Sequence, residues 1–304
     1  YIHHARGIPP DSTPAESSSI IRIHGSGSNP PLFVPHDLSG DVGFARHLSK
    51  YLGPDQPVYG FHNTWGSSAS ERGRSMEELA SGYIEDLIQF QPGGRYCLAG
   101  YSFSGYLAYE IARQLQLRGK SVLHLAVIDA GPPLPKPVPV TLALAGSLAF
   151  LKNVPLWVWD DLLKCPHEEM VRRIRRKANQ TRKGLRKAFS AGIRAGLDKD
   201  VGDIFALDRL PEEVVARMEF HLKILNAYNP GPYSGSFTLY RARTQPLLRW
   251  AERDLGWSRL VGRDFQIIKI SGSHESIGRD PQIRLVADAL RTSMNKLKNK
   301  IGNV

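Results

Sequence analysis

Short apolar runs alternate along the chain with stretches in which apolar residues recur at helical spacing. The apolar runs are typical of buried strands and lie at Ile20–His24, Leu32–Pro35, Pro57–Phe61, Arg95–Gly100, Val122–Ile128, Ser236–Tyr240 and Phe265–Ile270. Helical periodicity predicts helices over Val42–Leu52, Ser75–Phe90, Phe103–Arg118 and Pro281–Lys298. Strands that alternate with helices of this length predict an α/β fold, with a mostly parallel sheet and helices on both of its faces.

This alternation is interrupted between about Pro132 and Tyr228. Prolines open the interruption, and the patterns that follow are helical, at Pro166–Phe189 and Pro211–Tyr228. A segment of about ninety residues inside an α/β core favours a helical lid over the active site rather than an independent domain. Residues 1–19 are rich in Pro, Ser and His and lack periodicity, which predicts a linker before a single domain at 20–304.

The composition is that of a globular protein, with 304 residues of which 41 % are apolar and 23 % charged. Two cysteines are too few for a disulfide scaffold or a cysteine zinc site. The most apolar stretch, Val138–Leu151, contains Pro139 and is shorter than the ~20 residues that a membrane span needs. The beginning of the chain has no signal-peptide pattern, so we expect a cytoplasmic protein. Its first residue is Tyr1 rather than Met, as expected of a piece cut from a longer polypeptide.

A serine between small residues follows the strand Arg95–Gly100. A strand–turn–helix of this kind strains the backbone of its central residue and lifts the side chain above the sheet edge. Ser102 is therefore a candidate nucleophile at the positive end of the helix that follows. Gly100 and Ser104, two positions to either side, are small enough for the strand and the helix to approach closely. Taken alone, Ser102 is better explained as the N-cap of a buried helix.

Two further residues at strand ends supply what a serine nucleophile needs. Asp129 follows the strand Val122–Ile128, and His274 follows the last strand on a glycine-containing loop. Serine, acid and histidine occur in this order in triads of this fold type, and the carboxyl ends of parallel strands meet at one rim. We therefore predict that Ser102, Asp129 and His274 form a catalytic triad.

Each of these residues also has a plainer interpretation. Asp129 precedes Gly131 and Pro132 and would suit the start of a turn, and a lone loop histidine is commonly solvated. Other histidines are less suited to catalysis because they precede the core or lie in the insertion: His3, His4, His24, His167 and His221.

Several segments resemble the thioesterase domains of nonribosomal peptide and polyketide synthases, which have the α/β-hydrolase fold. The matching motifs are Pro-Leu-Phe-Val-Pro-His-Asp-Leu-Ser-Gly at 31–40, Gly-Tyr-Ser-Phe-Ser-Gly at 100–105, Val-Ile-Asp-Ala at 127–130, Tyr-Asn-Pro at 228–230, Tyr-Ser-Gly-Ser at 233–236, Gly-Trp at 256–257 and Gly-Ser-His at 272–274. The resemblance extends over roughly Ile20–Met294.

The resemblance implies a role for each matching residue. Ser102 is the nucleophile that becomes acylated, His274 the general base and then acid, and Asp129 the residue that orients the imidazole. The backbone N–H groups of Phe103 and Leu38 correspond to the oxyanion donors of the family.

Two residues depart from the family pattern. Ser104 stands where glycine is usual, which is a mild change at a small-residue position. Asp37 stands where the family has Gly or Pro, and it would set a negative charge beside a site built to stabilise negative charge. We expect the Asp37 side chain to face away from that site.

The resemblance implies an enzyme that releases an acyl or peptidyl chain from the phosphopantetheine thioester of a carrier protein, by hydrolysis or cyclisation. It implies no metal and no resident cofactor, because the pantetheine belongs to the carrier protein, which could lie in the same polypeptide. A free-standing carboxylesterase and a non-catalytic binding module on the same fold remain alternatives.

Positive charge is concentrated in the insertion. The net charge is +11. The stretch 172–194 contains ten basic residues and no acidic one: Arg172, Arg173, Arg175, Arg176, Lys177, Arg182, Lys183, Arg186, Lys187 and Arg194. A solvated helix face, general attraction to anions and docking of an acidic carrier protein all explain this cluster. Nucleic acid is a less suitable partner because no recognised binding module accompanies the charge.

Overall fold

The computed structural model describes residues 18–63, 75–133, 210–245 and 252–302, together with the single residues 155, 158 and 159. The elements in these ranges are β1 (Ile20–His24), β2 (Leu32–Pro35), α1 (Gly43–Leu52), β3 (Val58–Phe61), α2 (Met76–Phe90), β4 (Arg95–Tyr101), α3 (Phe103–Leu117), β5 (Ser121–Ile128), α7 (Glu212–Ala227), β6 (Phe237–Thr244), the 3₁₀ turn η4 (Trp257–Arg259), β7 (Phe265–Ser273), α8 (His274–Ile277) and α9 (Gln282–Gly302).

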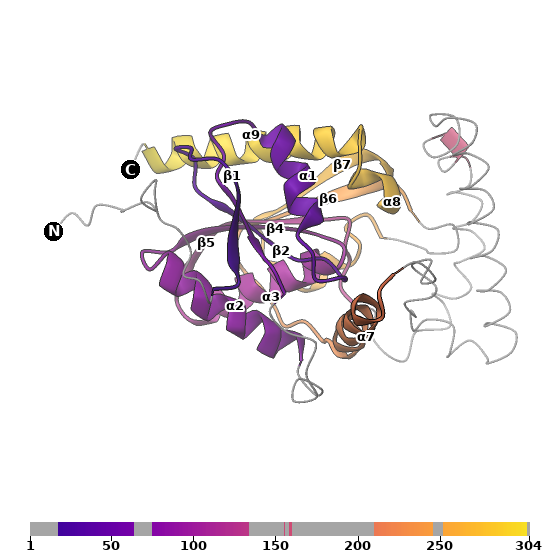
Figure 1. Cartoon of the computed structure of the whole chain (residues 1–304). Coiled ribbons are helices and arrows are strands. Elements are labelled where there is room, and N and C mark those ends of the chain that lie inside the picture. The colour runs from indigo at the N-terminus through magenta and orange to yellow at the C-terminus, as the bar shows by residue number, and fades with distance from the viewer. Residues whose placement is uncertain are drawn as a thin grey trace, which may run out of the picture.

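A seven-stranded sheet in the order β1-β3-β2-β4-β5-β6-β7 forms the centre of the molecule. Strand β1 runs antiparallel to β3, and every other neighbouring pair is parallel. Helices α1 and α9 lie on one side of this sheet, and α2 and α3 on the other (Figure 1). Each face buries its own apolar cluster, and α7 contributes to the cluster on the α2–α3 side. The predicted mostly parallel sheet with helices on both faces is confirmed.

Local sequence explains where the helices next to the site begin and end. Ser75 caps α2 through a capping box, in which its side chain accepts from the Glu78 N–H while the Glu78 side chain accepts from the Ser75 N–H. Gly119, with φ +69°, follows α3 and lets the chain turn back toward β5.

Two strands extend further than their sequence pattern indicates. Strand β6 continues past Tyr240 to Thr244, although Arg241 and Arg243 interrupt its apolar run. Strand β7 continues to Ser273, so His274 begins the short helix α8 instead of lying on a loop. Ser273 caps that helix through a box with Ser276, a weaker sequence signal than the usual Ser-x-x-Glu.

The predicted helix at Pro211–Tyr228 corresponds to α7. Most of the predicted linker, the predicted helix Pro166–Phe189 and the basic cluster at 172–194 lie outside the described residues. Among the helices that are described, none combines the length and the apolar character that crossing a bilayer requires.

Candidate active site

The turn between β4 and α3 holds Ser102 in a strained conformation. Its backbone has φ 55° and ψ −122°, a combination that non-glycine residues seldom adopt. The Ser102 N–H donates to the carbonyl of Ile128 at 3.2 Å, which fixes the turn at the carboxyl end of β5. The side chain thus stands at the sheet edge with the first turn of α3 behind it, as the sequence pattern predicts.

Close packing behind the serine requires small residues. A Cβ on Gly100 would overlap the Ser104 carbonyl group and lie 2.6 Å from the Gly105 nitrogen, so the position accepts only glycine. Ser104 is buried, and its hydroxyl donates to the Pro35 carbonyl at 2.9 Å. The serine that replaces the usual glycine therefore links the start of α3 to the end of β2.

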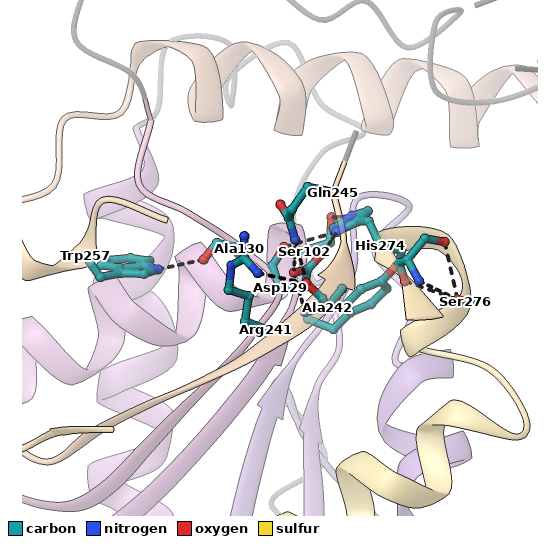
Figure 2. Close-up of polar contacts among 11 residues, drawn as sticks. Ser102, Asp129, Ala130, Arg241, Ala242, Gln245, Trp257, His274 and Ser276 are labelled. Atoms are coloured by element: carbon teal, nitrogen blue, oxygen red, sulfur yellow. Dashed lines mark hydrogen bonds and ion pairs between the residues drawn. The ribbon is translucent and has the colours of Figure 1, made fainter. Parts of the chain in front are cut away.

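His274 lies between the other two residues of the predicted triad (Figure 2). Its Nε2 is 3.1 Å from Ser102 Oγ, and its Nδ1 is 2.9 Å from Asp129 Oδ2. The structure brings these three residues together although 172 positions separate Ser102 from His274. A carboxylate only accepts hydrogen bonds, so the contact with Asp129 places the imidazole proton on Nδ1 and leaves Nε2 to accept from the serine hydroxyl.

The Asp129 carboxylate is buried and held on both oxygens. Its Oδ2 faces His274, while its Oδ1 accepts from the Ala242 N–H at 2.8 Å and from the Gln245 amide at 3.3 Å (Figure 2). Asp129 itself adopts φ 48°, and its N–H donates to the Tyr240 carbonyl at 2.9 Å. The part of β6 beyond Tyr240 therefore contributes to the site, because the Ala242 N–H binds the acid and Gln245 directly follows the strand.

Two aromatic residues fix the backbone around the acid and the histidine. The indole N–H of Trp257, which is fully buried, donates to the Ala130 carbonyl at 2.6 Å (Figure 2). The hydroxyl of Tyr101 donates to the backbone carbonyl of His274. Both contacts hold peptide groups next to the side chains of the predicted triad rather than those side chains themselves.

The loop after β2 closes on itself around Asp37. The Asp37 carboxyl accepts from the Ser39 N–H at 2.8 Å and from the Ser39 hydroxyl at 2.6 Å, and burial raises its pKa above the usual value. The Gly40 N–H donates to the Asp37 carbonyl at 3.0 Å, and Gly40 has φ +87°. The side chain of Asp37 is therefore bound within its own turn.

A family model and several synthases are similar in sequence to this chain. Residues 30–140 match the family model of the thioesterase domain. A non-reducing polyketide synthase from Pseudevernia furfuracea is 27 % identical over 94 % of this chain, which spans 13 % of that protein. Malpibaldin synthetase from Mortierella alpina is 37 % identical over 38 % of this chain, which covers 2 % of its length. The resemblance to thioesterase domains of such synthases is confirmed.

Solved thioesterase structures share the fold. The thioesterase domain of NocB, bound covalently to a fluorophosphonate nocardicin G analogue, superposes with a TM-score of 0.58 at 19 % identity, over 90 % of this chain and 99 % of that one. A four-domain nonribosomal peptide synthetase superposes with a TM-score of 0.61 at 23 % identity, over 91 % of this chain and 20 % of that one. The predicted α/β-hydrolase fold is confirmed, and this chain spans only a small part of the relatives that are whole synthases.

Sequence reasoning missed several residues that surround the predicted triad. Gln245 and Tyr101 contact the acid and the histidine, and neither stood out because their partners lie far away along the chain. His221, set aside as a residue of the insertion, belongs to α7, and its ring contacts the loop after β2. Within the described ranges, no group of three or more His, Cys, Asp or Glu side chains has the arrangement of a metal site.

Proposed function

We propose that this domain is a chain-releasing serine thioesterase. The observation that carries the proposal is the continuous relay from Asp129 Oδ2 through His274 to Ser102 Oγ, with distances of 2.9 and 3.1 Å. A serine hydroxyl becomes a competent nucleophile only when a histidine takes its proton and an acid holds that histidine in the correct tautomer. The three side chains follow β4, β5 and β7, at one edge of the sheet, which supports the proposal.

The proposed reaction has two halves. Ser102 Oγ attacks the thioester carbonyl while His274 Nε2 takes the hydroxyl proton. The tetrahedral intermediate then collapses, the C–S bond breaks, and the proton passes from His274 to the departing thiolate. In the second half His274 deprotonates water, or an amine or hydroxyl of the acyl chain itself, which attacks the acyl-enzyme ester. The ester C–O bond to Ser102 then breaks, and His274 returns the proton to Ser102 Oγ.

The N–H groups of Phe103 and Leu38 are the proposed oxyanion donors. Phe103 is the first residue of α3, so its N–H has no acceptor within the helix. The N–H of Leu38 has no hydrogen-bond acceptor in the part of the chain that the structure describes. Backbone donors that point at a developing oxyanion typically lower the barrier by ~3–4 kcal/mol each.

The substrate class and the partner follow from the resemblance. We propose that the acyl or peptidyl chain arrives on the phosphopantetheine arm of a carrier protein, so the domain needs no cofactor of its own. Support comes from the relatives, which are synthases and synthetases of much greater length than this chain. A free-standing carboxylesterase remains the second candidate, and it differs by hydrolysing simple esters without a preference for pantetheine thioesters.

Covalent labelling tests the proposed function. A fluorophosphonate probe is expected to attach once to the wild-type domain and not at all to Ser102→Ala. Mass spectrometry of the intact protein measures the added mass. Incubation with hexanoyl-pantetheine is expected to release free thiol in a Ser102-dependent manner. Absence of labelling would favour a binding module, and hydrolysis of p-nitrophenyl esters without activity on the pantetheine thioester would favour the esterase.

A further inference from the structure

Helix α7 places two side chains, one helical turn apart, on the loop that follows β2. His221 Nδ1 lies 2.8 Å from the Leu38 carbonyl oxygen. The Arg217 guanidinium reaches the Ser39 carbonyl at 3.4 Å, and its Cδ fills the space that a Cβ on Gly40 would need, at 2.7 Å. Side chains four residues apart share one face of a helix, so α7 presents this face to the loop.

The protonation of His221 follows from its partner. A carbonyl oxygen only accepts hydrogen bonds, so Nδ1 must carry the proton and donate it to Leu38. Burial lowers the pKa of His221 to about 4, which keeps the ring neutral near pH 7 with Nε2 unprotonated. Nε2 has no hydrogen-bond partner within the described ranges. The polar contact that remains to this buried ring is its bond to the Leu38 carbonyl.

The same ring packs against the start of α3. Its centroid lies 5.0 Å from that of Phe103 and 4.7 Å from that of His36, with interplanar angles of about 30°. Leu38 and Phe103 are the two residues whose N–H groups form the proposed oxyanion hole. His221 therefore touches both of them, one through a hydrogen bond and the other through its ring.

The peptide groups on both sides of Leu38 are anchored. The Asp37 carbonyl, which shares a peptide plane with the Leu38 N–H, accepts from His36 Nδ1 at 2.7 Å and from the Gly40 N–H at 3.0 Å. The oxygen and the N–H of a trans peptide point in opposite directions, so these anchors fix where the Leu38 N–H points. The bond from His221 fixes the peptide group on the other side of Leu38.

We propose that His221 is a positioning residue of the oxyanion hole, holding the Leu38 and Phe103 N–H groups so that they converge on the thioester oxygen. This inference rests on the proposed function. The oxygen gains its full negative charge only as the tetrahedral species forms, so misplaced donors raise the barrier more than they weaken substrate binding. The effect of His221 should therefore appear in kcat and leave KM nearly unchanged.

Three substitutions separate the hydrogen bond from the packing of the ring. His221→Phe keeps a ring and removes the donor. His221→Asn places an amide N–H near the position of Nδ1, and His221→Gln carries its amide further out, near the position of Nε2. His124→Phe is the matched control, because His124 is also buried, has an unpartnered Nε2 within the described ranges and has a pKa lowered to about 4. It lies five positions before Asp129, within β5.

The experiment measures kcat and KM with hexanoyl-pantetheine, and the inhibition constant of phenylboronic acid, which forms a tetrahedral adduct on a serine nucleophile. His221→Phe is expected to lower kcat by about 10- to 100-fold, with KM within about twofold of wild type. Phenylboronic acid should bind more weakly by a similar factor. His221→Asn is expected to recover most of kcat, His221→Gln to recover little, and His124→Phe to retain wild-type kcat even if its melting temperature falls.

Wild-type kcat in His221→Phe, or an equal loss in His124→Phe, would overturn the proposal. If His221→Phe does not fold, His221→Gln and His221→Asn decide, since equal kcat in these two variants contradicts a positioned donor. Fluorophosphonate labelling of the wild-type domain distinguishes a failure of the proposed thioesterase function from a failure of the proposed role of His221. Labelling combined with unaffected His221 variants rejects only the role of His221, whereas absent labelling rejects the thioesterase and this inference together.

Discussion

Tyr101 and His274 pack their rings together, with centroids 5.1 Å apart, and the Tyr101 hydroxyl donates to the His274 backbone carbonyl. Tyr101, which precedes Ser102, thereby holds both the ring and the backbone of His274. This contact joins the end of β4 to the start of α8, so the distance between Ser102 and His274 depends on Tyr101 as well as on Asp129.

Removing the Tyr101 hydroxyl is expected to loosen His274. Tyr101→Phe keeps the ring and loses one hydrogen bond, so kcat should fall by about three- to tenfold, as measured with a pantetheine thioester. Tyr96→Phe is the matched control, because Tyr96 lies near the other end of β4. Its hydroxyl also donates to a backbone carbonyl, that of Gln91, at 2.9 Å. Equal kcat values in Tyr101→Phe and Tyr96→Phe would argue against a role in positioning His274.

The contacts of Asp129 predict a graded series. In Asp129→Asn the new NH₂ group must face either the donors that now bind Oδ1 or His274 Nδ1. An NH₂ group that faces Nδ1 donates to it and moves the imidazole proton to Nε2, which is the wrong tautomer, so kcat should fall by about 10³- to 10⁴-fold. Gln245→Leu removes the longer of the two bonds to Oδ1, together with the bond from the same amide to the Ala242 carbonyl, and should lower kcat by about two- to fivefold. The measurement is kcat at saturating thioester. A loss in Gln245→Leu as large as that in Asp129→Asn would contradict this order.

Gly100 and Gly119 differ in what surrounds them. Gly100→Ala would press a Cβ into the backbone of the first turn of α3, and we expect the free energy of unfolding to fall by about 3 kcal/mol or more. Gly119→Ala meets no atom within 4 Å and suffers only from its φ of +69°, so the loss should be about 1 kcal/mol. Urea unfolding measures both. The prediction fails if the two variants are equally stable.

Stability is expected to decrease in mild acid. Burial lowers the pKa values of His36, His124 and His221 below the usual value, so from about pH 6.5 downward the unfolded chain binds protons that the native state does not. For each of these histidines, proton binding by the unfolded chain lowers the free energy of unfolding by up to about 2 kcal/mol between pH 6.5 and pH 5. The raised pKa of Asp37 acts in the opposite direction, because the native state favours its neutral form.

Urea unfolding at pH 7.5, 6 and 5 measures this dependence. The stability of His124→Leu should depend less steeply on pH than that of the wild type, because one of the buried rings is gone. Identical slopes in the two proteins would show that His124 takes up a proton as readily in the native state as in the unfolded chain.

The strand–helix alternation and the positions of Ser102, Asp129 and His274 at strand ends follow from the amino-acid sequence alone. These features depend on local rules: apolar periodicity, glycine beside the serine, and the meeting of parallel strand ends at one edge. The sequence also identified Ser104 as a small residue in a tight position. That its hydroxyl would bind the Pro35 carbonyl could not be read locally, because 69 positions separate the two residues.

The groups that hold these side chains and the loop after β2 in place could be identified only from the folded chain. Gln245 reaches Asp129, Tyr101 reaches His274, and His221 reaches Leu38 across separations of 116, 173 and 183 positions. A single hydrogen bond between distant residues leaves no periodic pattern in a sequence, because its geometry depends on how whole strands and helices pack. The end of β6 could not be predicted for the same reason. Its charged residues end the apolar pattern after Tyr240, whereas the strand continues to Thr244 and its Ala242 N–H binds Asp129.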